Sequence, residues 1–265
     1  PGLPAEDSVS LPAEGDYTVF GEDEVPPEAT VQVAVPRLPF VSNFTDLEPL
    51  AAEPGVRVCY VPLEADLKAY DAVVLPGSKN TVDDLRALQE AGFGARIRAF
   101  DGPIVGICGG YQMLGDRIDA AGIESTEVSG TVDGLGLLRV VTTFSEEKEV
   151  SRTTCTVEGS GPISGATGAA SGYEIHMGET RFRKPLDHPL EPTSARDGAI
   201  LGTYLHGIFE NERVRRAFLD GLFERAGVDR PAVPKADTSP YERAANLVET
   251  HLDLSQVDAL SDWLS

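Results

Sequence analysis

The chain has 265 residues, enough to bury one sizeable core, and its hydrophobic content of 41% is ordinary for a globular protein. Asp and Glu outnumber Lys and Arg by 43 to 22, which gives a formal net charge of −21. A charge of this sign repels phosphate groups, so we expect neither nucleic acid nor an anionic membrane as a partner. Acidic residues spread along the whole chain, as here, are typical of proteins that remain soluble at high salt.

The sequence shows no signal for export and no metal-binding pattern. Its apolar runs fall short of the roughly 20 residues that span a bilayer, and it begins at Pro1 without a basic-then-apolar signal. Its three cysteines are widely spaced, with no C-x-x-C pair and no Cys/His cluster. We expect a cytoplasmic protein without a structural metal, and the later part of a longer chain. Cys59 and Cys155 lie in β-branched runs, where a buried, inert thiol is expected.

The N-terminal half of the chain predicts an α/β fold. Residues 1–30 are rich in Pro, Glu, Asp and Gly, which predicts a linker or arm, and a folded domain is expected from 31 to 226. Its predicted strands cover 31–35, 56–61, 71–77 and 103–107, and its predicted helices cover 42–50, 78–92 and 95–100. Such alternation predicts a mostly parallel sheet covered on both faces, with functional groups beyond the C-terminal ends of the strands.

The residue pattern changes after these alternating strands and helices. Between residues 130 and 183, glycines and short β-like runs predict added antiparallel strands. The run 199–207 predicts a further strand, and 211–227 predicts a helix. A Pro-rich break and an amphipathic pattern follow, so we expect residues 227–265 to form a C-terminal helical extension packed on the core.

The segment Ile104–Gln112, IVGICGGYQ, reads as a buried strand that breaks sharply into a helix at Cys108. Gly106 and Gly110 give the G-x-nucleophile-x-G spacing, in which small residues allow a strained turn that pushes the nucleophile outward. The sulfur would lie at a helix N-terminus, whose partial positive charge favours thiolate over thiol. A core position would not require glycine on both sides, so we predict that Cys108 is a nucleophile.

Three further residues are expected near the sulfur. Gly109 would place its N–H beside it, and Gly77, at the end of a neighbouring strand, could supply a second donor for an oxyanion. Gln112 would lie one helical turn after the cysteine and point back over the site. The alternative is that Gln112 is simply a good helix former.

A thiol nucleophile generally needs a base, and the chain has four histidines. His188 lies in a loop with a flanking proline and His251 on the final helices, and both are expected to be solvated surface groups. His206 ends an apolar strand and is followed by a glycine and a loop. We predict that His206 is the base.

The remaining histidine, His176, lies in the short predicted strand that contains Tyr173 and Glu174. Strand alternation places Glu174 and His176 on one face. These three residues could line a substrate pocket, or they could belong to an ordinary half-exposed strand.

Four segments carry a family resemblance: LPGSKNT, GICGGYQMLG, GYEIHMGET and GTYLHGIF, in this order. Together they resemble the glutamine amidotransferase domain of cobyric acid synthases, a branch of the class I glutamine amidotransferases, over about residues 31–211. The wider class has G-x-C-x-G-x-Q at its nucleophile, and Gly106, Cys108, Gly110 and Gln112 match it. The resemblance implies a three-layer class I glutamine amidotransferase fold.

The resemblance also implies an activity. Cys108 would attack the side-chain carboxamide of glutamine, His206 would protonate the departing ammonia, and water would resolve a γ-glutamyl thioester. The ammonia would pass to a synthetase domain that normally precedes this one and uses ATP and Mg²⁺. That domain amidates the b, d, e and g carboxylates of cobyrinic acid a,c-diamide in cobalamin biosynthesis. No cofactor is expected in this chain itself.

The sequence leaves two points open. In the wider class a glutamate stands two residues after the base, but here that residue is Ile208. Glu174, Glu210 or a carboxylate from another domain are the candidates for orienting His206. The alternative assignments are the glutaminase domain of cobyrinic acid a,c-diamide synthase, an amidotransferase linked to a Mur ligase, or a non-catalytic partner that retains the fold.

Overall fold

The computed structural model describes residues 18–20, 30–123, 130–191 and 194–232. The chain divides into two compact units, Pro1–Pro231 and Ala232–Ser265. The first unit contains the whole fold described below. The predicted linker and the predicted C-terminal extension lie mostly outside the described residues, and the domain boundaries remain predictions.

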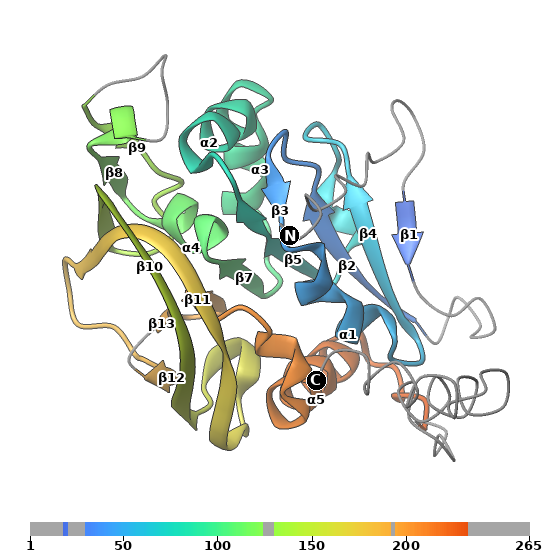
Figure 1. Ribbon diagram of the computed structural model, residues 1–265. Helices are drawn as coiled ribbons and strands as arrows, with labels where there is room; N and C mark the ends of the chain where they lie inside the picture. The colour runs from blue at the N-terminus through green and yellow to red at the C-terminus, as the bar shows by residue number, and fades with distance from the viewer. Residues whose placement is uncertain (1–17, 21–29, 124–129, 192–193, 233–265) are drawn as a thin grey trace, which may run out of the picture. The chain divides into compact units, whose positions relative to one another are not determined.

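A sheet of seven strands, in the order β1-β4-β2-β5-β7-β14-β13, forms the centre of the described part of the first unit (Figure 1). Its strands are β1 (Thr18–Phe20), β2 (Val31–Pro36), β4 (Val56–Val61), β5 (Ala72–Leu75), β7 (Ile104–Ile107), β13 (Ser194–Asp197) and β14 (Ile200–Thr203). The inner strands pair in parallel, and β1 and β13 pair antiparallel at the two edges. The predicted mostly parallel sheet is therefore confirmed.

Helices cover both faces of this sheet, which gives three layers (Figure 1). They are α1 (Glu48–Ala51), α2 (Thr81–Glu90), α3 (Phe93–Arg98), α4 (Gly109–Leu114) and α5 (Glu212–Ala226). Because side chains alternate along a strand, Val33 and Val35 of β2 pack in the cluster that holds apolar residues of α1 and α5. Ala34, between them, packs in the cluster formed with α2, α3 and α4.

A long hairpin dominates the second sheet, in which β10 (Val140–Glu158) pairs antiparallel with β11 (Thr167–Phe182). Short strands β8 (Arg117–Asp119), β9 (Val132–Asp133) and β12 (Leu190–Glu191) complete it. The pairing register shifts between Thr143 and Lys148, opposite Gly178, whose φ is 93°. The predicted antiparallel additions are confirmed, although the separate runs predicted there merge into two long strands.

The C-terminal ends of the parallel strands lie at one edge of the sheet, and the segments that leave this edge build the site. After β2 come β3 (Val41–Ser42) and the 3₁₀ helix Phe44–Leu47, and after β5 comes β6 (Gly77–Ser78). β3 and β6 pair antiparallel, with Ser42 opposite Gly77. Helix α4 follows β7, and residues 204–207 follow β14.

Residues away from this edge mostly follow expectation. Cys59 and Cys155 are buried and unpaired, and burial raises the pKa of both thiols, as expected for inert cysteines. His188 is half-buried rather than solvated, because its Nδ1 lies 2.6 Å from the carbonyl oxygen of Ser194. His251 lies outside the described residues. Of the helices that the structure describes, none has the length and apolar character needed to cross a membrane.

Candidate active site

Cys108 lies at the sharp turn between β7 and α4, as the sequence predicts. Its backbone has φ 53° and ψ −111°, a strained conformation for a residue other than glycine. The amide N–H of Cys108 donates to the carbonyl oxygen of Thr203 at 2.8 Å, which ties the turn to the end of β14. The side chain is 8% exposed, and Sγ lies 3.1 Å from the carbonyl oxygen of Ile175 on β11.

Both flanking glycines are required by close packing. A side chain at Gly110 would overlap the carbonyl oxygen of Leu75, because the first turn of α4 crosses the end of β5. A side chain at Gly106 would come within 2.7 Å of the carbonyl oxygen of Gly110 and 2.6 Å of Leu114 Cδ1. The G-x-C-x-G pattern is therefore a steric requirement of the turn that presents Cys108.

His206 is fully buried and bonded to a carboxylate that the sequence analysis did not single out, Asp46. Asp46 Oδ2 lies 2.7 Å from Nδ1 of His206, and Asp46 Oδ1 accepts the N–H of Gly207 at 2.8 Å. Two bonds to adjacent residues fix both the ring and the backbone that carries it. The carboxylate on His206 is thus neither Glu174 nor Glu210.

The surroundings of His206 favour its charged form. Burial alone would lower the pKa of this histidine, but the hydrogen bonds and negative charges of Asp46 and Cys108 outweigh burial and raise the pKa to about 9. Nδ1 of the ring is bonded to Asp46, and the ring also interacts with the side chain of Cys108. The site can therefore hold an imidazolium beside the Cys108 sulfur at neutral pH.

Two more side chains lie against the ring of His206. Nδ2 of Asn43 lies 3.1 Å from Nε2 and 3.2 Å from Nδ1, so this amide lies across the ring rather than in line with one nitrogen. Asn43 has a left-handed backbone, φ 54° and ψ 51°, which asparagine tolerates better than most residues. Tyr173 stacks on the ring at 5.0 Å between centroids, and its backbone exchanges hydrogen bonds with that of His206.

Gly77 and Gly109, the predicted oxyanion donors, lie on adjoining segments. A side chain on Gly77 would meet Cε1 of His206 at 3.3 Å and Oγ of Ser42 at 3.1 Å. One on Gly109 would meet Cβ and the backbone nitrogen of Ser78 at 3.0 and 3.1 Å. Gly77 therefore lies against the base, and the next residue in its strand packs on the first residue of α4.

The side-chain amide of Gln112 is bonded within the protein. It donates to the carbonyl oxygen of Met177 at 3.2 Å and to the hydroxyl of Tyr204 at 3.3 Å, and it accepts from Thr81 at 3.3 Å. Gln112 is 2% exposed. In this structure its amide joins α4 to β11, beside the sulfur, and its predicted contact with substrate stays a prediction.

Glu174 and His176 share a face of β11, as alternation predicts, and their Oε2 and Nε2 atoms lie 3.5 Å apart. The ring of His176 stacks on Tyr204 at 4.1 Å and its Nδ1 lies 3.1 Å from the carbonyl oxygen of Gly178. The neighbouring residues of the same strand, Ile175 and Met177, contact Cys108 and Gln112 through their carbonyl oxygens. His176 is therefore bonded into the hairpin, and His206 is the histidine coupled to the sulfur.

The sequence around Asp46 is typical of an ordinary short helix, so it does not predict a catalytic role for this residue. The available signal was its position shortly after the C-terminal end of β2, at the same sheet edge as Gly77, Cys108 and His206. Asp46 is also 3% exposed, which is unusual for a carboxylate without a partner. Its burial is explained by its bonds to His206 and Gly207.

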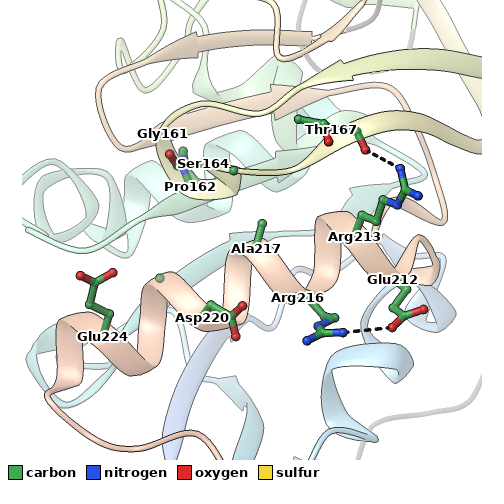
Figure 2. Close-up of a pocket in the computed structure, with 12 residues that line it drawn as sticks. Gly161, Pro162, Ser164, Thr167, Glu212, Arg213, Arg216, Ala217, Asp220 and Glu224 are labelled. Carbon is green, nitrogen blue, oxygen red and sulfur yellow. Dashed lines mark hydrogen bonds and ion pairs between the residues drawn. The ribbon is translucent and has the colours of Figure 1, made fainter.

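A separate groove of about 550 Å³ lies between α5 and the connection from β10 to β11 (Figure 2). Its charged side chains bond to nearby groups: Arg213 donates to the carbonyl oxygen of Thr167 at 3.2 Å, and Arg216 pairs with Glu212 at 3.5 Å. Neither Cys108 nor His206 lines it. This groove is therefore not part of the site at the sheet edge.

The site thus combines a sulfur on a strained turn, a buried histidine and a carboxylate on that histidine, with two glycine segments beside them. Such an arrangement suits nucleophilic attack on a carbonyl carbon and transfer of an acyl group. The fold itself is shared with a solved structure. PurLQS from Thermotoga maritima superposes with a TM-score of 0.51 over 73% of this chain and 99% of that chain, at 16% identity.

Fold and site together define an α/β protein with the three-layer architecture of the class I glutamine amidotransferases. Residues 32–214 match the family model described as the CobB/CobQ-like glutamine amidotransferase domain, and the chain belongs to this family. A protein of Halobacterium salinarum named "Probable cobyric acid synthase" is 58% identical over 257 residues. One of the same name from Methanococcoides burtonii is 41% identical over 260 residues. Each match covers 96% of this chain and 50% of the relative, so the chain spans about half their length.

Proposed function

We propose that this chain is the glutaminase part of a cobyric acid synthase, with Cys108 as nucleophile and His206 as general base and acid. The observation that carries the proposal is the buried contact between Asp46 and His206, 2.7 Å, in a site whose histidine is also coupled to the Cys108 sulfur. Asp46 takes the orienting role for which Ile208 offers no carboxylate. Family membership supports glutamine as the substrate.

In the proposed mechanism, the thiolate of Cys108 attacks the side-chain carbonyl carbon of glutamine, and the carbonyl oxygen becomes an oxyanion. The N–H groups of Gly109 and Gly77 stabilise that charge. His206 gives its proton to the departing nitrogen, ammonia leaves, and a γ-glutamyl thioester remains on Cys108. His206 then takes a proton from water, which attacks the thioester and releases glutamate.

The proposal extends to the domain and substrate that accept the ammonia. The resemblance of the sequence motifs leads us to propose a synthetase domain that uses ATP and Mg²⁺ to amidate the b, d, e and g carboxylates of cobyrinic acid a,c-diamide. The name of the relatives, cobyric acid synthase, supports this acceptor. Their length, about twice that of this chain, supports a partner region outside it. A cytoplasmic location belongs to the same proposal.

The second candidate is the glutaminase domain of a cobyrinic acid a,c-diamide synthase, because the family description names both branches. It would use the same residues and differ in the carboxylates amidated. The names of the relatives favour cobyric acid synthase. Incubating the full-length gene product with cobyrinic acid a,c-diamide, ATP, Mg²⁺ and glutamine decides between them, since only a cobyric acid synthase adds amide groups to this substrate.

Glutamate release from glutamine tests the glutaminase assignment. We expect release by the full-length gene product, near-complete loss in Cys108→Ala, and retention in Cys155→Ala, whose thiol lies buried in the core. A Cys108→Ala protein that released glutamate at the normal rate would overturn the assignment. So would a well-folded normal protein that released none in the presence of all substrates.

A further inference from the structure

A second carboxylate beneath the site, Asp84, has no place in the mechanism above. It lies in the first turn of α2 and is completely buried. Charged side chains are almost never fully buried unless a specific contact holds them. The burial of Asp84 is explained by its bonds to two segments of the chain.

Asp84 bonds to strand β6 and to the residue just before strand β3, the two strands of the small sheet at the edge of the site. Its Oδ1 accepts the backbone N–H of Phe40 at 2.9 Å, just before β3. Its Oδ2 accepts the hydroxyl of Ser78 in β6 at 2.5 Å. The same hydroxyl accepts the N–H of Asn80 at 3.0 Å, so Ser78 is held from both sides.

Each of these two segments carries part of the proposed catalytic machinery. Phe40 leads into Asn43 and Asp46, which contact His206. Ser78 follows Gly77, the proposed oxyanion donor that packs against the His206 ring. The carboxylate of Asp84 therefore connects the segment that orients the base to the segment that receives the oxyanion.

We propose that Asp84 is a positioning residue for glutamine hydrolysis, which fixes the spacing between the oxyanion donor Gly77 and the base His206. The proposal rests on the glutaminase assignment above. A shift of about 1 Å between catalytic groups can lower a rate roughly 100-fold, so a carboxylate that sets this spacing has a measurable effect. Asp84 touches no substrate and acts only through Phe40 and Ser78.

The effect of Asp84 on folding stability distinguishes a positioning role from a purely structural one. Burial raises its pKa to about 6, against bonds from Ser78 and Phe40 that lower it. Because the folded state binds this proton more tightly than the unfolded state, stability falls as the pH rises from 3.8 to about 6. The ionised carboxylate thus costs stability at neutral pH. A neutral amide of the same shape would remove that cost while weakening the two bonds.

The test compares Asp84→Asn with Asp83→Asn in the full-length gene product. Asp83 is the adjacent carboxylate and accepts from the side chain of Asn80, the N-cap of the same helix, at 2.6 Å, so it supports that cap. For Asp84→Asn we expect kcat for glutamine hydrolysis to fall about 10- to 100-fold, KM to stay nearly constant, and Tm at neutral pH to be unchanged or higher. For Asp83→Asn we expect a normal kcat and a lower Tm.

A third variant, Ser78→Ala, removes only one of the two bonds, and we expect a smaller loss of kcat than in Asp84→Asn. The proposal is overturned if Asp84→Asn hydrolyses glutamine at the normal rate, or if its loss of rate merely follows a loss of folded protein. If the protein without any substitution lacks glutaminase activity, the proposed function itself is contradicted. The two failures are therefore distinguishable.

Discussion

Asp46 and His206 are 160 positions apart in sequence, yet Oδ2 of one lies 2.7 Å from Nδ1 of the other inside the protein. Their contact joins the connection after β2 to the segment after β14, across the ends of β5 and β7, the strands that precede Gly77 and Cys108. Asp46 thereby provides the carboxylate on His206 that Ile208 cannot provide. Catalysis in the proposed mechanism depends on this pair, and its consequences can be measured.

The first prediction concerns Asp46→Asn. The variant keeps the shape of the side chain but removes the charge that holds the His206 ring in its tautomer, so kcat for glutamine hydrolysis should fall roughly 10²- to 10⁴-fold. KM for glutamine should change little, because Asp46 does not contact substrate in the proposed mechanism. Steady-state glutamate release measures both constants.

Glu210→Gln provides the matched control for Asp46→Asn. Glu210 lies four residues after His206 and was a candidate for orienting it. In the structure, however, His206 bonds to Asp46. We expect the control to keep nearly normal kcat. A normal rate in Asp46→Asn, or an equal loss in both variants, would contradict the role of Asp46.

The second prediction is a pH dependence of stability. His206 has a folded pKa of about 9, above its ordinary 6.5, so its charge contributes fully to stability below pH 6.5. That contribution is lost as the pH rises from 6.5 through about 9. Denaturant titrations should show the free energy of unfolding falling over this window, and falling less in Asp46→Asn. Equal slopes in the two proteins would count against the coupling.

Much of this architecture was predictable from local patterns, while the closure of the site was not. Continuous apolar runs such as Ala72–Leu75 predict buried parallel strands, and the glycines around Cys108 predict the turn, because both depend on neighbouring residues. Asp46 and Gln112 find their partners far along the chain. Nothing in the local pattern of either residue indicates His206 or Met177 as a partner.

The third prediction tests the steric reading of the turn. In Gly110→Ala the new methyl group would overlap the carbonyl oxygen of Leu75, so unfolding free energy should fall by about 1–3 kcal/mol or more. Gly221 lies on an exposed position of α5 with open space around it. Gly221→Ala should raise helix stability by up to about 1 kcal/mol. Chemical denaturation of both variants measures the contrast, and a tolerated Gly110→Ala would contradict the packing argument.

The fourth prediction concerns Gln112. Its buried amide bonds to Met177 and Tyr204, so Gln112→Ala should cost about 1–3 kcal/mol of stability by leaving a buried carbonyl without its donor. Denaturant unfolding provides the measurement. A variant with normal stability and only a raised KM for glutamine would show that the side chain serves the substrate rather than the hairpin.

The most direct test of the central claim is to trap the acyl intermediate. Radiolabelled glutamine is mixed with the full-length gene product, the reaction is stopped with acid, and the labelled peptide is identified by mass spectrometry. We expect one γ-glutamyl group on the peptide that contains Cys108, none on those with Cys59 or Cys155, and no label in Cys108→Ala. Glutamate release with label on another residue, or undiminished labelling of Cys108→Ala, would contradict it.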